Sequence, residues 1–206
     1  MCVWTGDMES LQIKALEERY LEDIVRIHQN VLGYTFNSCL GSDHLSFMYR
    51  TMAQQGESHV GVALLDDQPV GVISGTIDMD KTKSTLLNSF KPQQWANLVI
   101  HVLKQPSLVG EWWKGNIIGG ELNFEGETVQ PILTTIAVDS GFHGKGIGRH
   151  LVHDLECFFR QKDIHYYRLD TVITNHGARA FYKSLGYQEI ETRADSILYI
   201  KRVANE

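Results

Sequence analysis

The stretch ILTTIAVDSGFHGKGIGRHL, residues 132–151, joins an apolar strand-like run to a glycine-rich loop and an amphipathic helix. Three glycines, Gly144, Gly146 and Gly148, alternate with other residues where this helix begins. Glycine lets the backbone approach a ligand closely, and the first turn of a helix presents unpaired N–H groups and the positive end of the helix dipole. We therefore predict a phosphate-binding loop for a nucleotide-bearing ligand.

The spacing of the glycines argues against two other nucleotide-binding loops. A P-loop requires Lys and then Ser or Thr after its last glycine, but Ile147 follows Gly146. A dinucleotide-binding loop requires G-x-G-x-x-G, yet Arg149 and Leu151 stand three residues after Gly146 and Gly148. An unrelated nucleotide-binding protein is therefore the weakest of the function classes, and binding of ATP or NAD would favour it.

The run His143-Gly144-Lys145-Gly146-Ile147-Gly148, which follows the strand ending near Val138, resembles the acetyl-CoA loop of the GCN5-related N-acetyltransferase (GNAT) superfamily. The signature of that family is Gln or Arg, two residues, Gly, one residue, then Gly or Ala. His143 stands where the family has Gln or Arg. The family holds the pyrophosphate chiefly with backbone amides, so this departure weakens the match only a little.

A second segment, HYYRLDTVITNHGARAFYKSLGY at residues 165–187, also resembles this family. It carries Asn175, Ala178 and Tyr182 in the N-x-x-A-x-x-x-Y spacing and closes on L-G-Y at residues 185–187. The resemblance is specific from about residue 132 to residue 187, and upstream it rests on the order of the elements. It implies an α/β fold with a mixed, mostly antiparallel central sheet and helices on both faces.

Hydrophobic periodicity agrees with that element order. It predicts a strand at 11–16, a helix at 20–32, a helix at 43–55 capped near Ser42, and a hairpin of 60–65 and 70–77 turning at Asp66-Asp67-Gln68-Pro69. It also predicts a helix at 85–104 that Pro92 breaks or restarts. The helix after the glycine loop carries a core-facing stripe of Ile147, Leu151, Leu155, Phe158 and Phe159.

One domain over residues 1–206 is expected, with an insertion at about 78–131 between the hairpin and the cofactor-binding strand. The insertion holds the aromatic run Glu111-Trp112-Trp113. It could form a lid or specificity wall on the acceptor side, or a packing subdomain or dimer surface. Aromatic side chains are more often buried for packing, which favours the second interpretation and leaves open a homodimer.

The resemblance implies acetyl-CoA as co-substrate, no metal, and direct transfer in a ternary complex. Asn175 would bond the pantetheine arm and also suits a helix N-cap, while Tyr182 would be the general acid to the CoA sulfur. An ordinary core role for Tyr182 is the alternative. Backbone N–H groups of the strand would hold the pantetheine and polarise the thioester, and those of the loop would take the pyrophosphate. The strand residues are Ile136, Ala137 and Val138, and the loop residues are His143, Gly144, Lys145, Gly146, Ile147, Gly148 and Arg149.

An acceptor ammonium must lose a proton before it attacks, so a general base is needed. Glu121, His101, Asp139 and Asp170 are candidates, and no motif selects among them.

Composition narrows the partners and the compartment. The net charge is −6 and no basic stripe is present, which argues against nucleic acid and is compatible with a basic acceptor. The cysteines Cys2, Cys39 and Cys157 form no C-x-x-C pair, which argues against a disulfide scaffold or zinc site and favours a reducing compartment. No run reaches the ~18 apolar residues of a membrane span, so a cytoplasmic protein is expected.

These observations predict an acetyl-CoA-dependent N-acetyltransferase acting on a primary amine of a small molecule, either an amine or an amino sugar. Protein N-termini or lysines are a second class of acceptor for the same chemistry. A non-catalytic acyl-CoA-binding module is the alternative from another class, and Tyr182 argues against it because binding alone needs no acid.

Overall fold

A computed structural model describes residues 11–104, 122–193 and 195–203. The strands are β1 (Leu11–Ala15), β2 (Ser58–Leu65), β3 (Gln68–Thr76), β4 (Leu122–Phe124), β5 (Glu127–Val129), β6 (Ile132–Val138), β7 (Tyr166–Val172), β8 (Gln188–Thr192) and β9 (Ser196–Arg202). The helices are α1 (Leu21–Leu32), α2 (Phe36–Cys39), α3 (Ser42–Ala53), α4 (Met79–Asn88), α5 (Pro92–Lys104), α7 (Ile147–Gln161) and α8 (His176–Ser184), with 3-10 turns η1 (Glu18–Tyr20) and η2 (Ser140–Phe142).

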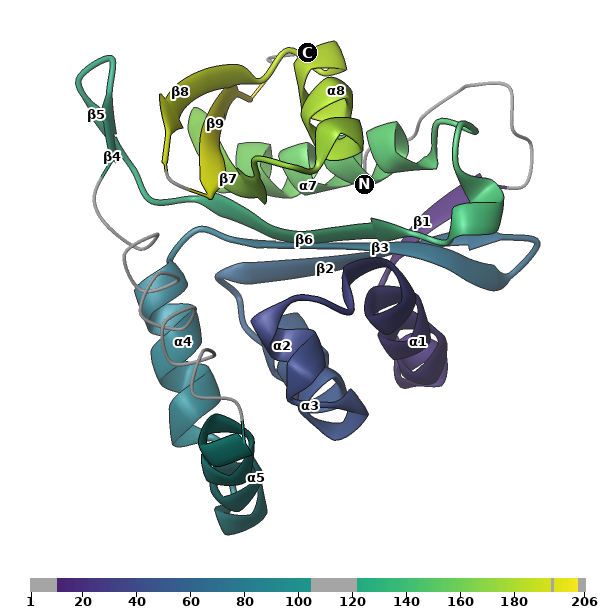
Figure 1. The fold of residues 1–206 in the computed structure, drawn as a ribbon. Coiled ribbons are helices and arrows are strands. Elements are labelled where there is room, and N and C mark those ends of the chain that lie inside the picture. The colour runs from purple at the N-terminus through teal and green to yellow at the C-terminus, as the bar shows by residue number, and fades with distance from the viewer. Residues whose placement is uncertain (1–10, 105–121, 194, 204–206) are drawn as a thin grey trace.

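Seven of these strands form the main sheet, in the order β1-β2-β3-β6-β7-β9-β8 (Figure 1). Every neighbouring pair is antiparallel except β6 and β7, which run parallel. The strands β4 and β5 form a separate small hairpin. The predicted mixed, mostly antiparallel sheet is therefore confirmed.

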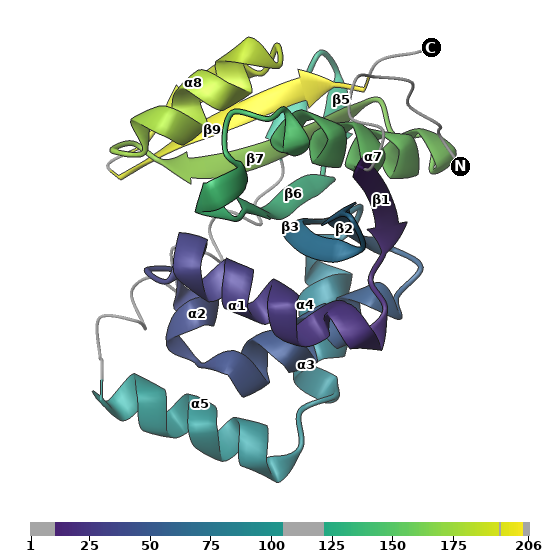
Figure 2. The same cartoon turned by 90° about the vertical axis from the view of Figure 1, so that its right-hand side faces the viewer.

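Helices cover both faces of the sheet, as predicted. Figure 2 shows α1, α2, α3 and α4 on one side and α7 and α8 on the other. Strand β2 serves both sides because its side chains alternate. Val60, Val62 and Leu64 pack into the core beneath α1 and α3, whereas Ala63 belongs to the core beneath α7.

Helix α7 lies close to the sheet because small residues face it. A Cβ added at Gly75 of β3 would lie 2.7 Å from Leu155 Cδ1, and one at Gly71 would lie 3.2 Å from Leu151 Cδ1. The predicted stripe on α7 is confirmed: Ile147, Leu151, Leu155 and Phe159 are buried, and Phe158 is partly buried against the same core. This contact places the first turn of α7, and with it the glycine loop, beside β6.

The β2–β3 hairpin turns in two residues, so the predicted four-residue turn is wrong. Asp66 and Asp67 both adopt positive φ, at 50° and 59°, which suits the tight turn between twisted strands. Strand β3 already begins at Gln68, and Pro69 pairs with Leu64 beside an irregularity in the register. A proline that cannot donate to the ladder is tolerated at such a bulge.

One prediction about the helices before the hairpin also needs correction, and one short helix there was not predicted. The N-cap of α3 is Gly41, at φ 91°, and Ser42 is the first residue inside the helix, so Ser42 does not cap it. The short helix α2 was not expected, because four residues are too few to show a helical period.

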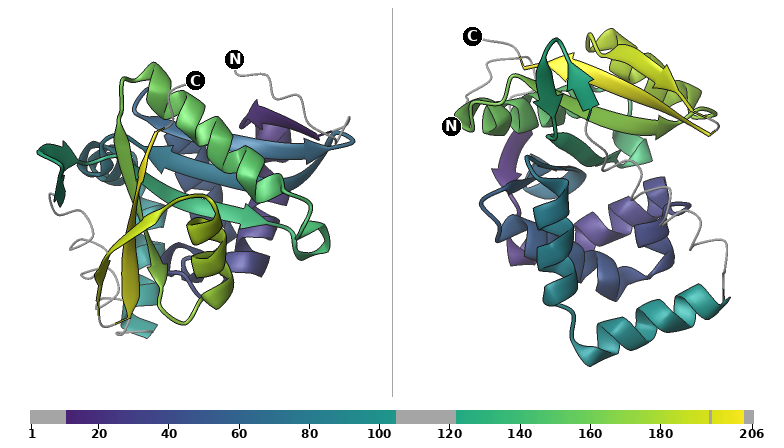
Figure 3. Two further views of the ribbon diagram at one scale, coloured as in Figure 1. Left: turned by 90° about the horizontal axis from the view of Figure 1, so that it is seen from above. Right: turned by 90° about the vertical axis from the view of Figure 1, so that its left-hand side faces the viewer.

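The described part of the 78–131 segment forms α4, α5 and the β4–β5 hairpin. Helix α4 begins at Met79 rather than at residue 85, because the Asp78 side chain accepts a hydrogen bond from Lys81 N at 2.8 Å and caps it. Pro92 starts α5. Both helices lie on the same side of the sheet as α3 (Figure 3), where the Phe90 ring contacts Phe47 of α3 at a centroid distance of 5.4 Å. Trp112, Trp113 and Glu121 lie outside the described residues.

None of the helices in residues 11–104, 122–193 and 195–203 combines the length and apolar character that a bilayer crossing requires.

Candidate functional site

The main sheet opens between β6 and β7. Their parallel pairing joins Ile132 to Arg168, and Arg168 N donates to Pro131 O at 3.0 Å. Over the described residues no other register pair links the two strands. Beyond this point, residues 133–138 and 170–172 line opposite parts of one cavity. The opening therefore turns the edge of a central strand into the wall of a binding site.

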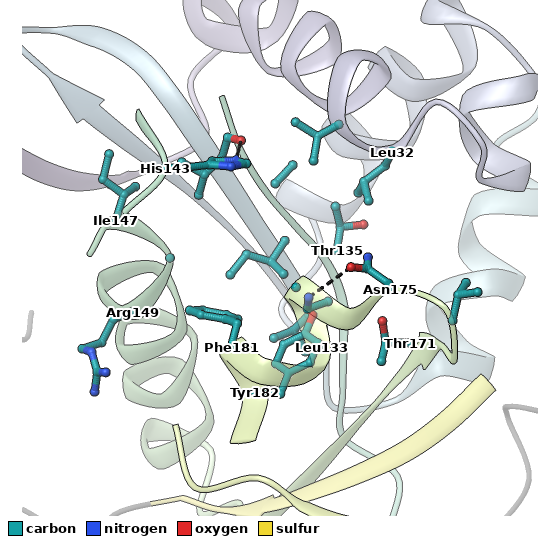
Figure 4. Close-up of a pocket in the computed structure, with 18 of the residues that line it drawn as sticks. Leu32, Leu133, Thr135, His143, Ile147, Arg149, Thr171, Asn175, Phe181 and Tyr182 are labelled. Carbon is teal, nitrogen blue, oxygen red and sulfur yellow. Dashed lines mark hydrogen bonds between the residues drawn. The ribbon is translucent and has the colours of Figure 1, made fainter. Parts of the chain in front are cut away.

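The cavity has a volume of about 800 Å³, within the range of small-molecule sites (Figure 4). It brings together all but one of the predicted site residues. Those that line it are Ile136, Ala137, Val138, His143, Gly144, Gly146, Ile147, Gly148, Arg149, Asn175 and Tyr182. Lys145 is the exception, and its ammonium lies 4.9 Å from the centroid of the Phe142 ring.

The glycine loop presents backbone N–H groups to this cavity. Gly144 and Gly146 have φ of 77° and 79°, a conformation that side-chain-bearing residues rarely adopt, and Gly146 is the N-cap of α7. In the described structure, the N–H groups of residues 144–148 make no hydrogen bond to the protein. The helix dipole adds partial positive charge at the same place, and Arg149 adds a full one. This end of the cavity therefore suits an anion.

Gly148 also has a packing role that was not predicted. A Cβ added there would lie 3.0 Å from Phe181 Cζ in α8. The lack of a side chain at Gly148 thus lets α7 and α8 pack together, in addition to lining the cavity.

The backbone of β6 alternates between its neighbour β3 and the open edge. Asp139 N donates to Val70 O at 2.9 Å, and Ala137 lies opposite Val72, so the alternation of an antiparallel ladder directs the N–H of Ala137 to β3. The same alternation directs the polar groups of Ile136 and Val138 to the cavity. The His143 ring, whose Nε2 lies 2.8 Å from Val138 O, meets one of them there.

Asn175 and Tyr182 lie at the two ends of α8. The Asn175 side chain caps the helix by accepting from Ala178 N at 3.0 Å, which confirms the predicted N-cap, and it also lines the cavity (Figure 4). Tyr182 is 6% exposed, and its ring packs against Tyr187 and Tyr199 at centroid distances of 5.2 and 6.0 Å. Burial, and secondly the nearby Tyr34, raise the pKa of Tyr182 well above the usual tyrosine value. Tyr182 therefore keeps its proton at neutral pH.

The four candidate bases differ in where they lie relative to the cavity. Asp170 of β7 lines the cavity. Asp139 instead caps η2 by accepting from Gly141 N at 3.1 Å and pairs with Arg26 at 3.8 Å. His101 lies in α5, but its side chain falls outside the described residues, as does the whole of Glu121. Of the candidates whose side chains are described, only Asp170 is among the residues that line the cavity.

The positively and negatively charged side chains line different parts of the cavity. Among its lining residues the side chains that carry charge or can acquire it near neutral pH are His143 and Arg149 beside α7 and Asp170 on β7. The Asp170 side chain is 9% exposed, and burial raises its pKa, an effect that the neighbouring Arg193 and Arg168 oppose. Asp170 lies two residues beyond the Ile132–Arg168 pair, near the start of β6, whereas the glycine loop follows the end of β6. The end of the cavity at the glycine loop thus suits an anion, and the end at Asp170 suits a cation.

One wall of the cavity was missed by the sequence reasoning. It is formed by the end of α1 and the residues after it, Val31, Leu32, Tyr34 and Thr35. The one signal in the sequence was Tyr34, an aromatic residue directly after Gly33, where α1 ends. The Tyr34 side chain is 56% exposed in the structure.

The α/β structure thus combines a sheet that splits beside a glycine loop with a cavity that is lined by backbone N–H groups, an arginine and a carboxylate. A family profile described as the Acetyltransferase (GNAT) family matches residues 21–187. The chain belongs to this family and is an N-acetyltransferase.

Solved structures share the fold. The ribosomal-protein-S18-alanine N-acetyltransferase from Escherichia coli is 15% identical, with a TM-score of 0.58 over 95% of this chain and 96% of that chain. Ard1 from Thermoplasma volcanium is 14% identical, with a TM-score of 0.60 over 95% and 99%. PaiA N-acetyltransferase from Thermoplasma acidophilum, in complex with coenzyme A, is 14% identical, with a TM-score of 0.56 over 94% and 99%. No match was found among curated proteins.

Proposed function

We propose that this N-acetyltransferase moves an acetyl group from acetyl-CoA to the primary amine of a small molecule, an amine or amino sugar, by direct transfer in a ternary complex. The observation that carries the proposal is the polarity of the cavity. Arg149 and the free amides of the glycine loop lie at one end, Asp170 lies at the other, and Tyr182 also lines the cavity.

The residues present fit acetyl-CoA, which supplies the acetyl thioester. The loop amides of residues 143–149 would hold the pyrophosphate, with Lys145 contributing its backbone alone. The N–H groups of Ile136 and Val138 would bind the pantetheine arm and polarise the thioester carbonyl. The side-chain NH₂ of Asn175 would bond the pantetheine, because its oxygen already caps α8. The co-crystallised coenzyme A of the PaiA enzyme, in the same fold, supports this assignment.

Two side chains would handle the protons. Asp170, as a carboxylate, would bind the acceptor ammonium and take its proton, leaving a neutral nucleophile. Tyr182 would give its proton to the departing thiolate. The raised pKa of Tyr182 keeps it protonated until a thiolate develops beside it.

The wall made by Val31, Leu32, Tyr34 and Thr35 faces the cavity from the end of α1 and favours a compact acceptor. A protein N-terminus is the second candidate, supported by the likeness in fold to the ribosomal-protein-S18-alanine N-acetyltransferase. The Asp170 carboxylate suits the ammonium group of either acceptor.

Calorimetric titration with acetyl-CoA, with ATP and NAD as controls, tests the co-substrate, and micromolar binding of acetyl-CoA alone is expected. Thiol release is then measured with a panel of small amines, amino sugars and short peptides with free N-termini. Turnover with a small amine at kcat/KM at least tenfold above that with any peptide supports the small-molecule acceptor. The opposite ranking assigns the enzyme to protein N-termini.

A further inference from the structure

The Asp170 carboxylate lies in an unusual position for a charged group. Both of its oxygens are buried, and among the described residues neither receives a hydrogen bond. A buried carboxylate is costly unless another charge compensates it. Something near Asp170 must therefore keep it in its charged form if it is to bind an ammonium group.

The charged groups that face Asp170 come from three elements. Arg193, between β8 and β9, places Nη1 3.7 Å from Asp170 Oδ1. Arg168 lies two residues earlier on β7, and Glu191 on β8 adds a negative charge. The attraction of Arg193 is the largest of the effects that favour the carboxylate over the protonated acid, followed by that of Arg168.

Arg193 is itself held in place. Its Nε and Nη2 donate to Glu191 Oε2 at 3.1 and 2.9 Å, and its backbone N donates to Ser196 O at 2.8 Å. Two of the three guanidinium nitrogens are thus anchored on β8, and the third lies beside Asp170. At 3.7 Å the pair is electrostatic and not hydrogen-bonded, so Arg193 compensates the charge of Asp170 without occupying a hydrogen-bonding position of either buried oxygen.

We infer that Arg193 is a positioning residue that holds Asp170 as a carboxylate ready to receive the acceptor ammonium. This inference rests on the proposed function. When an ammonium group enters, one N–H bond breaks and an O–H bond forms on Asp170. The neutral nitrogen then bonds to the acetyl carbon as the carbon–sulfur bond breaks, and Tyr182 protonates the sulfur. The second proton of the nitrogen returns to the Tyr182 phenolate, which leaves a neutral amide, and Asp170 releases its proton to water. Arg193 is not among the residues that line the cavity, so it would act through Asp170.

The test compares the neutral variants Arg193→Gln and Arg193→Met with the charge-preserving Arg193→Lys. The direct readout is the pH titration of the Asp170 carboxyl by carbon NMR in the ligand-free protein, assigned with Asp170→Asn. In both neutral variants the titration should move up by about one pH unit, because an opposite charge at this distance has been removed. In Arg193→Lys, the titration of the Asp170 carboxyl should stay closer to that of the wild type, because the positive charge is kept.

The second readout is the pH profile of kcat/KM. Its acidic limb should move up by about one pH unit in the neutral variants, which is about tenfold less activity on that limb. Arg50→Gln, which removes an arginine paired with Glu18 outside the cavity, is the control and should leave both readouts unchanged. A thermal melt confirms that each variant folds.

An Asp170 titration that is unchanged in both Arg193→Gln and Arg193→Met overturns the inference. If Asp170→Asn keeps full activity and the acidic limb, the proposed base fails instead. The NMR titration still reports on the pair in that case, so the two failures are distinguishable.

Discussion

Gly148 in the first turn of α7 lies so close to the Phe181 ring in α8 that a methyl group at this position would require the ring to shift by a few tenths of an ångström. A Cβ at Gly148 would lie 3.0 and 3.2 Å from two atoms of the ring. Both residues line the cavity. The packing of the two helices therefore controls where the first-turn amides of α7 lie.

Gly148→Ala should lower the melting temperature and weaken acetyl-CoA binding, because the Phe181 ring must shift and the start of α7 with it. In an isolated helix, a change from glycine to alanine stabilises the helix by about 1 kcal/mol. A loss of stability in Gly148→Ala would therefore identify the contact with Phe181 as the cause. The control is the Phe181→Leu background, where alanine at position 148 should be tolerated, and a double-mutant cycle measures the coupling. Equal effects in the two backgrounds would contradict the prediction.

Tyr182→Phe should reduce kcat by about 10²- to 10³-fold while leaving the Kd for acetyl-CoA within twofold, because the ring packing stays and only the proton donor is lost. Steady-state kinetics and calorimetry measure the two effects. Tyr187→Phe is the matched control, since its hydroxyl is buried 2.6 Å from that of Tyr167 and away from the cavity. It should cost about 1 kcal/mol of stability and leave kcat unchanged. Equal turnover by Tyr182→Phe and wild type would remove Tyr182 from the mechanism.

Asp170→Asn should lower kcat/KM by about 10²-fold or more and abolish the acidic limb of its pH profile. Because burial raises the pKa of Asp170, the charged form is less stable in the folded protein than in the unfolded chain at neutral pH. The neutral amide should therefore raise the melting temperature at pH 7 by about 3 °C. Calorimetry at pH 7 checks this gain, and a variant that loses both activity and stability would show that Asp170 is structural.

The stability of the protein should fall as the pH drops from about 6.5 towards 4, partly through His28. Its imidazole is 2% exposed and lies 2.6 Å from the Tyr49 hydroxyl, and burial lowers its pKa to about 4. The unfolded chain takes up this proton near the ordinary value of 6.5, before the folded protein does. The stability that the neutral His28 side chain contributes is therefore present above about pH 6.5. About 3 kcal/mol of the free energy of unfolding is lost once the pH has fallen below about 4.

Urea unfolding at pH 7.5 and 5.5 measures this effect. The wild type should lose about 1 kcal/mol more than His28→Gln between the two pH values, because glutamine does not titrate. An equal loss in both proteins would assign the pH dependence to other groups.

Local patterns in the sequence predicted much of the fold. The apolar run at residues 60–65 marked β2, the stripe on α7 marked its buried face, and Asn175 marked the start of α8. The sequence misplaced helix starts where two neighbouring residues are both suited to the N-cap position, as Gly41 and Ser42 are at the start of α3. Strands β8 and β9, which complete the sheet beyond β7, were not predicted at all.

By itself, the sequence determined the chemistry that the chain can offer: a glycine loop before a helix, an asparagine cap and a tyrosine one helix further on. These features depend on neighbours within a few residues. Only the tertiary structure decided that β6 and β7 separate after Ile132, that Asp170 alone of the described base candidates faces the opening, and that Arg193 lies beside it. The physical reason is that strand separation, burial and long-range charge pairing depend on residues distant in the chain, whose positions no local pattern encodes.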